Sequence, residues 1–132
     1  MILRATLDNI YSIKDETQIS FVAGKSNTHG EHVSRAEKRD YISVLKAGVI
    51  YGANASGKSN IIKAIALLQQ IAGGHFPQNK MEPFKLADTE NRNSKIEIEF
   101  KTLGKCYAYG VEFTIGGIKE EWLFEINSRT DK

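Results

Sequence analysis

The sequence predicts an α/β fold in which antiparallel strands surround one glycine-loop strand and one long helix. Two observations carry this prediction. A short apolar run over residues 48–51 precedes a glycine-rich loop over 52–59, and a helical apolar pattern over 57–72 overlaps and follows the loop. The segments on both sides of this unit alternate apolar and polar residues, with the two-residue period of half-buried strands. Together these patterns indicate a mixed sheet that holds the glycine-loop strand among antiparallel neighbours.

The size and composition of the chain limit the classes of protein it can belong to. Its 132 residues suffice for one domain, and its formal net charge of +2 does not indicate a strongly basic nucleic-acid binder. The single cysteine, Cys106, excludes an internal disulfide, and its alternating pattern favours a packing role over a reactive thiol. No apolar stretch approaches the roughly 20 residues of a membrane span, and no signal-peptide arrangement opens the chain. We therefore expect a cytoplasmic protein that does not bind membranes.

The N-terminal part of the chain contains two strand patterns and a polar insertion. Residues 2–8 and 16–22 are predicted to form strands joined by a connection over 9–15. Residues 24–40 are polar and lack apolar periodicity, which indicates an insertion loop. Residues 41–45 are expected to form a further short strand that leads toward the glycine loop.

A helix is predicted over residues 57–72. Its apolar side chains recur at helical spacing and cover enough of the surface to suggest burial on much of the circumference. These side chains are Ile61, Ile62, Ile65, Leu67, Leu68 and Ile71. Gly73 and Gly74 supply a stop signal, and a polar connection follows over residues 74–94.

Residues 95–126 are predicted to form an antiparallel meander. Residues 96–100 alternate isoleucine or phenylalanine with glutamate, and a turn over 103–105 follows. The pair Gly116 and Gly117 is typical of a two-residue hairpin. The apolar and aromatic side chains of the second and third strands are Tyr107, Tyr109, Val111, Phe113, Ile115, Ile118, Trp122, Phe124 and Ile126.

The glycine loop fits the phosphate-binding pattern G-x-x-x-x-G-K-[ST] at every specified position. Backbone N–H groups over residues 54–59 can form an anion-binding concavity at the positive end of the following helix. Gly52 and Gly57 permit close approach to phosphate oxygens, because they lack a Cβ. Lys58 can reach the β- and γ-phosphates, and the Ser59 hydroxyl can ligate a Mg²⁺ ion that bridges them. The competing interpretation is a glycine turn whose lysine is only solvated, and the flanking patterns favour the phosphate loop.

These chemical roles define the predicted site. Lys58 is expected to be catalytic and Ser59 to be the metal ligand, with ATP and Mg²⁺ as cofactors. The predicted nucleotide-binding residues are Gly52, Asn54, Ala55, Ser56, Gly57, Lys58, Ser59 and Asn60.

The residues around the loop resemble a known family. The sequence over 50–60, with an asparagine inside the loop and a Ser-Asn ending, resembles the phosphate loop of ABC-type ATPase heads of the SMC, RecF and OLD kind. Residues 7–15 are similar to the opening strand and loop of such heads. Four later segments resemble a prokaryotic branch of AAA-type ATPases, many of whose members belong to anti-phage defence or toxin–antitoxin modules: 83–86, 95–100, 107–110 and 120–123. The resemblance covers nearly the whole chain apart from the 24–40 insertion.

The resemblance implies that residues 1–132 are the N-terminal lobe of a phosphate-loop ATPase head. Such heads continue into a Q-loop, a signature motif, a Walker B strand and a switch histidine, and none of these can be assigned here. We therefore expect that the remainder of the ATPase domain is absent, that the core is incomplete, and that this piece alone is inactive. We also expect exposed apolar surface on the 57–72 helix or beside residues 48–51.

Two functions fit this resemblance. In the first, the lobe binds Mg-ATP, and hydrolysis in the complete protein drives assembly or conformational switching in phage defence or DNA-associated processes. In the second, the chain is a non-catalytic nucleotide-sensing or oligomerisation module of a larger complex. A generic phosphate-loop kinase or GTPase fits less well, because antiparallel strands precede the loop and a long meander follows the helix. The expected partners are the remainder of the domain, a second head in a homodimer, and an effector or toxin protein, while nucleic acid is left open.

Two groups of polar residues in the 24–40 insertion are weaker candidates. His29 and His32 have the chemistry of metal ligands, but the absence of a nearby cysteine or further histidine favours a solvated loop. Arg35, Lys38 and Arg39 form a short basic cluster for which solvated surface is favoured over contact with phosphate or nucleic acid.

The meander also carries candidates for which a structural role is favoured. Tyr107 and Tyr109 share a face with apolar residues, so core packing is favoured over base stacking, and Trp122 is expected to pack on the sheet. The acidic side chains of the meander are expected to lie on exposed strand faces rather than to act in catalysis; they are Glu97, Glu99, Glu120 and Glu121.

Overall fold

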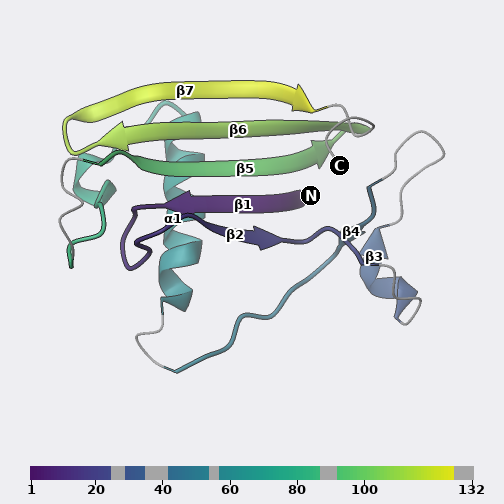
Figure 1. The fold of residues 1–132 in the computed structure, drawn as a ribbon. Helices are drawn as coiled ribbons and strands as arrows, with labels where there is room; N and C mark the ends of the chain where they lie inside the picture. Colours follow the sequence, from purple (N-terminus) through teal and green to yellow (C-terminus); the bar gives the residue numbers. More distant parts are fainter. Residues whose placement is uncertain (25–28, 35–41, 54–56, 87–91, 127–132) are drawn as a thin grey trace.

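The structure is a computed structural model that describes residues 1–24, 29–34, 42–53, 57–86 and 92–126. Its main feature is a five-stranded antiparallel sheet with the strand order β2-β1-β5-β6-β7. Helix α1 lies across one face of this sheet, and a small sheet formed by β3 and β4 lies beyond the end of β2 (Figure 1). Within the described ranges, no helix has the length and apolar character needed to span a membrane.

The observed elements follow most of the sequence patterns. The strands are β1 (Ile2–Asp8), β2 (Thr17–Ser20), β3 (Val33–Ser34), β4 (Val44–Leu45), β5 (Ser94–Thr102), β6 (Lys105–Thr114) and β7 (Gly117–Ile126). The helices are α1 (Lys58–Ala72) and the short 3₁₀ turns η1 (Gly30–His32) and η2 (Gln78–Lys80). The strands predicted over 2–8 and 16–22, the helix over 57–72 and the meander over 95–126 are therefore confirmed.

Three predicted details are wrong. No strand forms over residues 48–51, so the described part of the main sheet is antiparallel and does not contain the glycine-loop segment. The insertion over 24–40 is not loop throughout, since its described residues include η1 and β3. The last hairpin turns at Ile115 and Gly116 instead of at Gly116 and Gly117, since Thr114 pairs with Gly117, and Ile115 is exposed in the turn. The α/β architecture is confirmed, whereas the central position of the glycine-loop strand is not.

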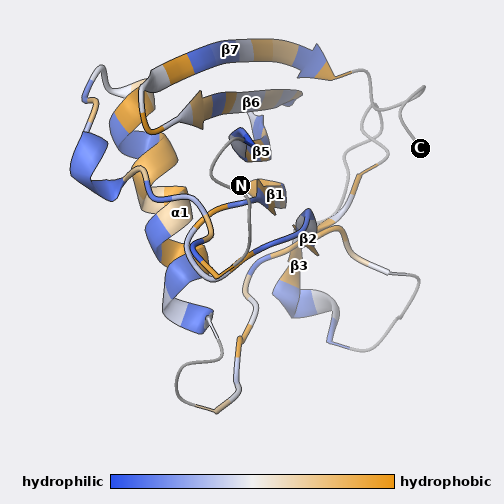
Figure 2. Ribbon diagram, turned by 60° about the vertical axis from the view of Figure 1, so that its left-hand side comes forward, coloured by the Kyte–Doolittle hydropathy of each residue, from blue (hydrophilic) through white to orange (hydrophobic). Residues whose placement is uncertain are grey.

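The main core lies between α1 and the sheet. The helix presents one apolar side to the sheet (Figure 2), and its buried residues are Ala64, Leu67, Leu68 and Ile71. They pack against a set of fully or largely buried strand residues: Leu7, Ile96, Ile98, Val111 and Phe113. The predicted burial on much of the helix circumference is wrong, because Ile62 is 62% exposed and faces away from this cluster. A single sheet can cover only one side of a helix, so the remaining apolar side chains need another partner to be buried.

A smaller apolar cluster lies on the other side of the sheet. Leu3, Val44 and Cys106 form its buried centre, and partly buried residues such as Phe21 and Ile126 pack around it. The Leu45 N–H donates to the Phe21 carbonyl at 2.7 Å, which ties β4 to the end of β2. The predicted packing role of Cys106 is therefore confirmed.

The same side of the sheet carries polar contacts between neighbouring strands. The Trp122 Nε1–H donates to Glu97 Oε2 at 2.7 Å, and Arg4 Nη1 lies 3.4 Å from Glu99 Oε2. Gly110 lies between Glu97 and Trp122 in the strand register, so the indole crosses directly over the glycine. The predicted packing of Trp122 on the sheet is confirmed. Of the glutamates predicted on exposed strand faces, Glu120 and Glu121 are exposed, whereas these contacts leave Glu97 and Glu99 only half-exposed.

Replacing Gly110 by alanine is expected to destabilise the sheet. A Cβ at this position would lie 2.5 Å from a carbon of the Trp122 ring, so the indole must move, which disturbs its bond to Glu97. Overpacking of this kind costs about 1–3 kcal/mol, which urea unfolding can measure. Gly116→Ala is the matched control, because its Cβ would meet only Thr114 Oγ1 at 3.6 Å. Equal stability of the two variants would contradict the proposed contact.

Candidate functional site

The chain approaches the glycine loop through an extended, exposed segment. After β4 (Val44–Leu45), residues 48–51 pair with no strand in the described part of the chain (Figure 1). Val49 is 87% exposed and Tyr51 is 90% exposed, although both are apolar or aromatic. A parallel strand forms only where neighbouring strands receive its hydrogen bonds and helices cover its faces. The exposed apolar surface predicted beside residues 48–51 is therefore confirmed, while the strand is not formed.

The loop ends at a glycine with a left-handed backbone. Gly57 caps the start of α1 with φ 92° and ψ 4°, a conformation that residues with a Cβ rarely adopt. A Cβ on Gly57 would also lie 2.7 Å from Ser12 Oγ. The second glycine of the motif is thus required both by its own backbone and by the neighbouring β1–β2 connection.

The lysine of the motif folds back across the loop. Lys58 Nζ donates to the carbonyl oxygens of Gly52 and Ala53, both at 2.6 Å. Ser59 follows as an exposed residue in the first turn of α1, at the end of the helix where the dipole is positive. An ammonium group and a hydroxyl therefore belong to neighbouring residues at a helix N-terminus, which is a donor set suited to phosphate oxygens and a hard cation. The nucleotide-binding, catalytic and metal-ligating roles of all the predicted residues stay predictions. Three of these residues lie outside the described ranges: Asn54, Ala55 and Ser56.

Sequence reasoning did not identify Ser12 as a site residue. Asn60 Nδ2 donates to Ser12 Oγ at 2.8 Å, which connects the first turn of α1 to the β1–β2 connection. The two residues are 48 positions apart, so no spacing pattern could reveal the contact. The only available signal was the resemblance of residues 7–15 to the opening loop of ATPase heads.

Hydrogen bonds to later parts of the chain hold the β1–β2 connection in place. Asn9 is fully buried with φ 49°, and its Nδ2 donates to the Arg92 carbonyl at 2.8 Å. The Phe84 N–H donates to Asn9 Oδ1 at 3.3 Å, and the Tyr11 N–H donates to the Glu82 carbonyl at 2.9 Å. These bonds fix the β1–β2 connection, which contacts the first turn of α1. The end of the glycine loop at this contact is called the loop base.

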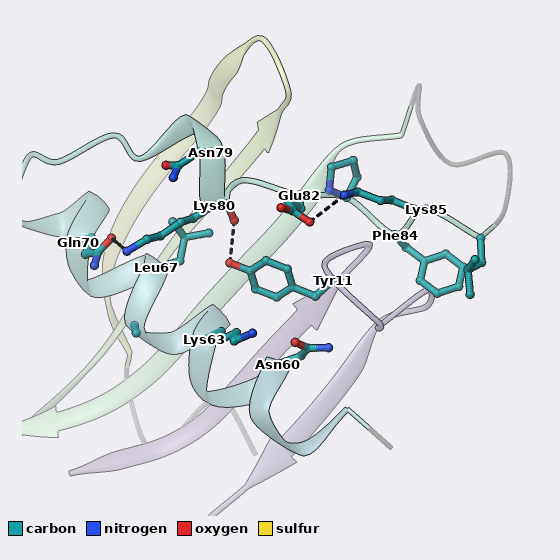
Figure 3. A pocket seen from close by; sticks show the side chains of 13 residues that line it. Tyr11, Asn60, Lys63, Leu67, Gln70, Asn79, Lys80, Glu82, Phe84 and Lys85 are labelled. Atoms are coloured by element: carbon teal, nitrogen blue, oxygen red, sulfur yellow. Dashed lines mark hydrogen bonds and ion pairs between the residues drawn. The ribbon is translucent and has the colours of Figure 1, made fainter. Parts of the chain in front are cut away.

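A groove of about 620 Å³ runs along α1 beside the loop base (Figure 3). Asn60, Lys63 and Gln70 line it from the helix, and residues 79–80 and 82–86 line it from the facing segment. Tyr11 stands between the two sides and donates its hydroxyl to the Lys80 carbonyl at 2.7 Å. Burial, with a smaller contribution from the nearby Glu82 carboxylate, raises the pKa of Tyr11 and keeps the phenol a donor. The sequence did not predict this groove.

The remaining candidates are separate from the loop. Tyr107 stacks on Phe100 with ring centroids 5.7 Å apart, and Tyr109 packs against the main core, so the predicted packing roles are confirmed. Tyr109 also donates its hydroxyl to Glu121 Oε1 at 2.7 Å. Arg35, Lys38 and Arg39 lie outside the described residues.

Comparison with protein families gives a match over residues 49–132, well over half of the chain. The matched region includes the whole glycine loop, α1 and the meander. A search of curated proteins finds no match. AAA domains have a nucleotide-binding function of the ATPase type, which agrees with the donor set at the start of α1. The chain belongs to the family described as "AAA domain, putative AbiEii toxin, Type IV TA system".

Proposed function

We propose that this chain binds Mg-ATP through residues 52–59, and that ATP hydrolysis in the complete protein drives assembly or conformational switching in a toxin–antitoxin or phage-defence module. The observation that carries the proposal is the position of Lys58, whose ammonium is held at 2.6 Å from the carbonyls of Gly52 and Ala53. Ser59 is next to it in the first turn of the same helix. The AAA family match supports the nucleotide-binding part of the proposal.

The residues present fit this ligand. Lys58 is held over the loop by two neutral carbonyl acceptors, and phosphate oxygens would offer it stronger, charge-assisted bonds. Ser59 offers a hydroxyl oxygen, the hard ligand type that Mg²⁺ prefers. Gly57 has no side chain to block the backbone N–H groups at the helix start. When bound, Mg-ATP supplies the anhydride bond whose cleavage releases the free energy for switching.

Hydrolysis also requires a group that orients or deprotonates water. Three of the four glutamates considered above have other partners: Glu97 accepts from Trp122, Glu99 from Arg4 and Glu121 from Tyr109. The fourth, Glu120, is exposed on β7 and belongs to a different element from the glycine loop. We therefore assign the water-orienting group to the remainder of the ATPase domain or to a second head in a homodimer. An effector or toxin protein is the proposed receiver of the switch.

A non-catalytic sensing or oligomerisation module is the second candidate function. It is supported by the apolar surface of Val49, Tyr51 and Ile62, which is exposed and suited to a protein partner. The two functions differ in turnover, since a sensing module would bind the nucleotide and the complete protein would not hydrolyse it. Phosphate release by the complete protein, measured with and without Mg²⁺, separates them.

Replacing Ser59 by alanine is expected to remove most of the Mg²⁺ dependence of ATP binding. The wild-type chain should bind a fluorescent ATP analogue more tightly with Mg²⁺ than with EDTA, because the Ser59 hydroxyl ligates the ion. The Ser59→Ala chain should give nearly the same affinity in both conditions. Ser20→Ala, an exposed serine in edge strand β2, is the control and should behave as wild type. Absence of any ATP binding by the wild-type chain, or an unchanged Mg²⁺ effect in Ser59→Ala, would contradict the proposed site.

A further inference from the structure

Three side chains with metal-ligating atoms meet in the η1 turn, far from the glycine loop in the sequence. His29 Nδ1 lies 3.3 Å from Glu31 Oε1, and His32 Nε2 lies 3.5 Å from the same oxygen. The three ligand atoms lie within 4.8 Å of one another. In the part of the chain that the structure describes, this is the one group of three such residues. The η1 turn lies next to β3, to the side of the main sheet (Figure 1).

The carboxylate of Glu31 makes a metal site a stronger interpretation of the two histidines. The sequence favoured a solvated loop because neither a cysteine nor a further histidine lies nearby, whereas the structure brings in the carboxylate of Glu31. Zinc binds imidazole nitrogen and carboxylate oxygen at about 2.0–2.1 Å, so neighbouring ligand atoms in a tetrahedral site lie roughly 3.3 Å apart. The two nitrogen–oxygen distances of 3.3 and 3.5 Å are close to that value. All three ligand atoms lie within 4.8 Å of one another, and the exposed side chains are free to adjust the remaining separation by rotation.

The backbone of the turn is held in the conformation that brings the ligands together. His29 has φ 55° and ψ 46°, a left-handed conformation that is uncommon outside glycine. The His32 N–H donates to the His29 carbonyl at 3.0 Å, and the Lys46 N–H donates to the His32 carbonyl at 2.8 Å. Lys46 Nζ donates to the backbone carbonyl of Glu31 at 2.7 Å. These bonds attach all three ligand residues to each other or to the segment after β4.

We propose that His29, Glu31 and His32 form a binding site for a divalent transition-metal ion of the Zn²⁺ class. Two imidazoles and one carboxylate suit Zn²⁺, and the exposure of all three side chains leaves room for water to complete the coordination. Mg²⁺ fits poorly, since it prefers an all-oxygen shell. The site is distinct from the glycine loop. A bound ion would link the three ligand side chains of the η1 turn, which is also hydrogen-bonded to Lys46.

Zinc titration of the untagged, chelator-treated chain tests this proposal. In competition with a chromogenic chelator, the wild-type chain should bind one Zn²⁺ per chain, and excess Mg²⁺ should not displace it. Each of His29→Asn, Glu31→Gln and His32→Gln should weaken binding by at least about tenfold. Asparagine is chosen for residue 29 because it tolerates the left-handed backbone while removing the imidazole. Substitution of Co²⁺ should give a visible absorption spectrum in wild type that the variants lose.

Two further variants keep the test specific. His75→Gln removes the third histidine of the chain, which lies after α1, and should leave Zn²⁺ affinity unchanged. Lys58→Ala should also retain Zn²⁺ binding, so a failure of the nucleotide proposal would not imitate a failure of this one. Wild-type affinity in both His29→Asn and His32→Gln, or loss of binding in His75→Gln, would overturn the proposed site.

Discussion

Replacing Lys58 by alanine is expected to lower the affinity of the chain for Mg-ATP by about 100-fold or more, which corresponds to about 2.7 kcal/mol. The substitution removes the ammonium that lies against the carbonyls of Gly52 and Ala53 and would contact the β- and γ-phosphates. In the complete protein the same change should abolish ATP turnover. Isothermal titration calorimetry measures the first effect, and phosphate release measures the second.

Lys63→Ala provides the matched control for Lys58→Ala. Lys63 is an exposed lysine on the same helix and lines the groove rather than the loop. Lys63→Ala removes one positive charge from α1, as Lys58→Ala does. The two variants therefore change the long-range electrostatic field by a similar amount, but only Lys63→Ala keeps the contact between Lys58 and the loop. An equal loss of affinity in both variants would show that net charge rather than the loop contact controls nucleotide binding, and would contradict the assigned role of Lys58.

Replacing Gly57 by alanine is expected to destabilise the start of α1 by about 2–4 kcal/mol and to abolish nucleotide binding. Part of this cost arises because alanine disfavours φ 92°, and part because its Cβ would lie 2.7 Å from Ser12 Oγ. Relief of either strain would move the loop end and misalign Lys58. Thermal and urea unfolding measure the stability, and calorimetry measures the lost binding.

Two comparisons separate the contributions at Gly57. Gly73→Ala, at the other end of α1, should be well tolerated, since its φ is −80° and the nearest atoms would lie 3.5 Å from the new Cβ. The double variant Ser12→Ala/Gly57→Ala removes the close oxygen and should be more stable than the sum of the two single changes predicts. Additive single effects would show that the Ser12 contact does not contribute to the requirement for glycine.

Much of the fold was predictable because the local side-chain pattern of each element indicates its type. Alternating side chains over residues 2–8 and 95–126 identified the strands of the main sheet, and helical spacing identified α1 nearly to its ends. The buried position of Cys106 also followed from this alternation. The periodicity of an element reflects which of its faces pack against apolar neighbours. For these strands and for α1, such neighbours are present within the described chain.

The errors occurred where the outcome depends on a distant partner. The run over 48–51 has the composition of a buried strand, yet it is exposed because no described strand lies beside it. Ile62 continues the apolar pattern of α1 but faces away from the described sheet that covers the helix. Local pattern measures the tendency to be buried, whereas actual burial also requires a surface to pack against.

The sequence by itself determined the phosphate-loop motif, the main-sheet strands, helix α1 and the chemical roles open to Lys58 and Ser59. Only the tertiary structure decided that Ser12 contacts the start of α1 and that a groove lies along that helix. Motif chemistry depends on residues adjacent in the chain, so a linear pattern can reveal it. Contacts such as that between Ser12 and Asn60 depend on how the chain returns to itself, and the free energy of that packing is shared among residues far apart in the sequence.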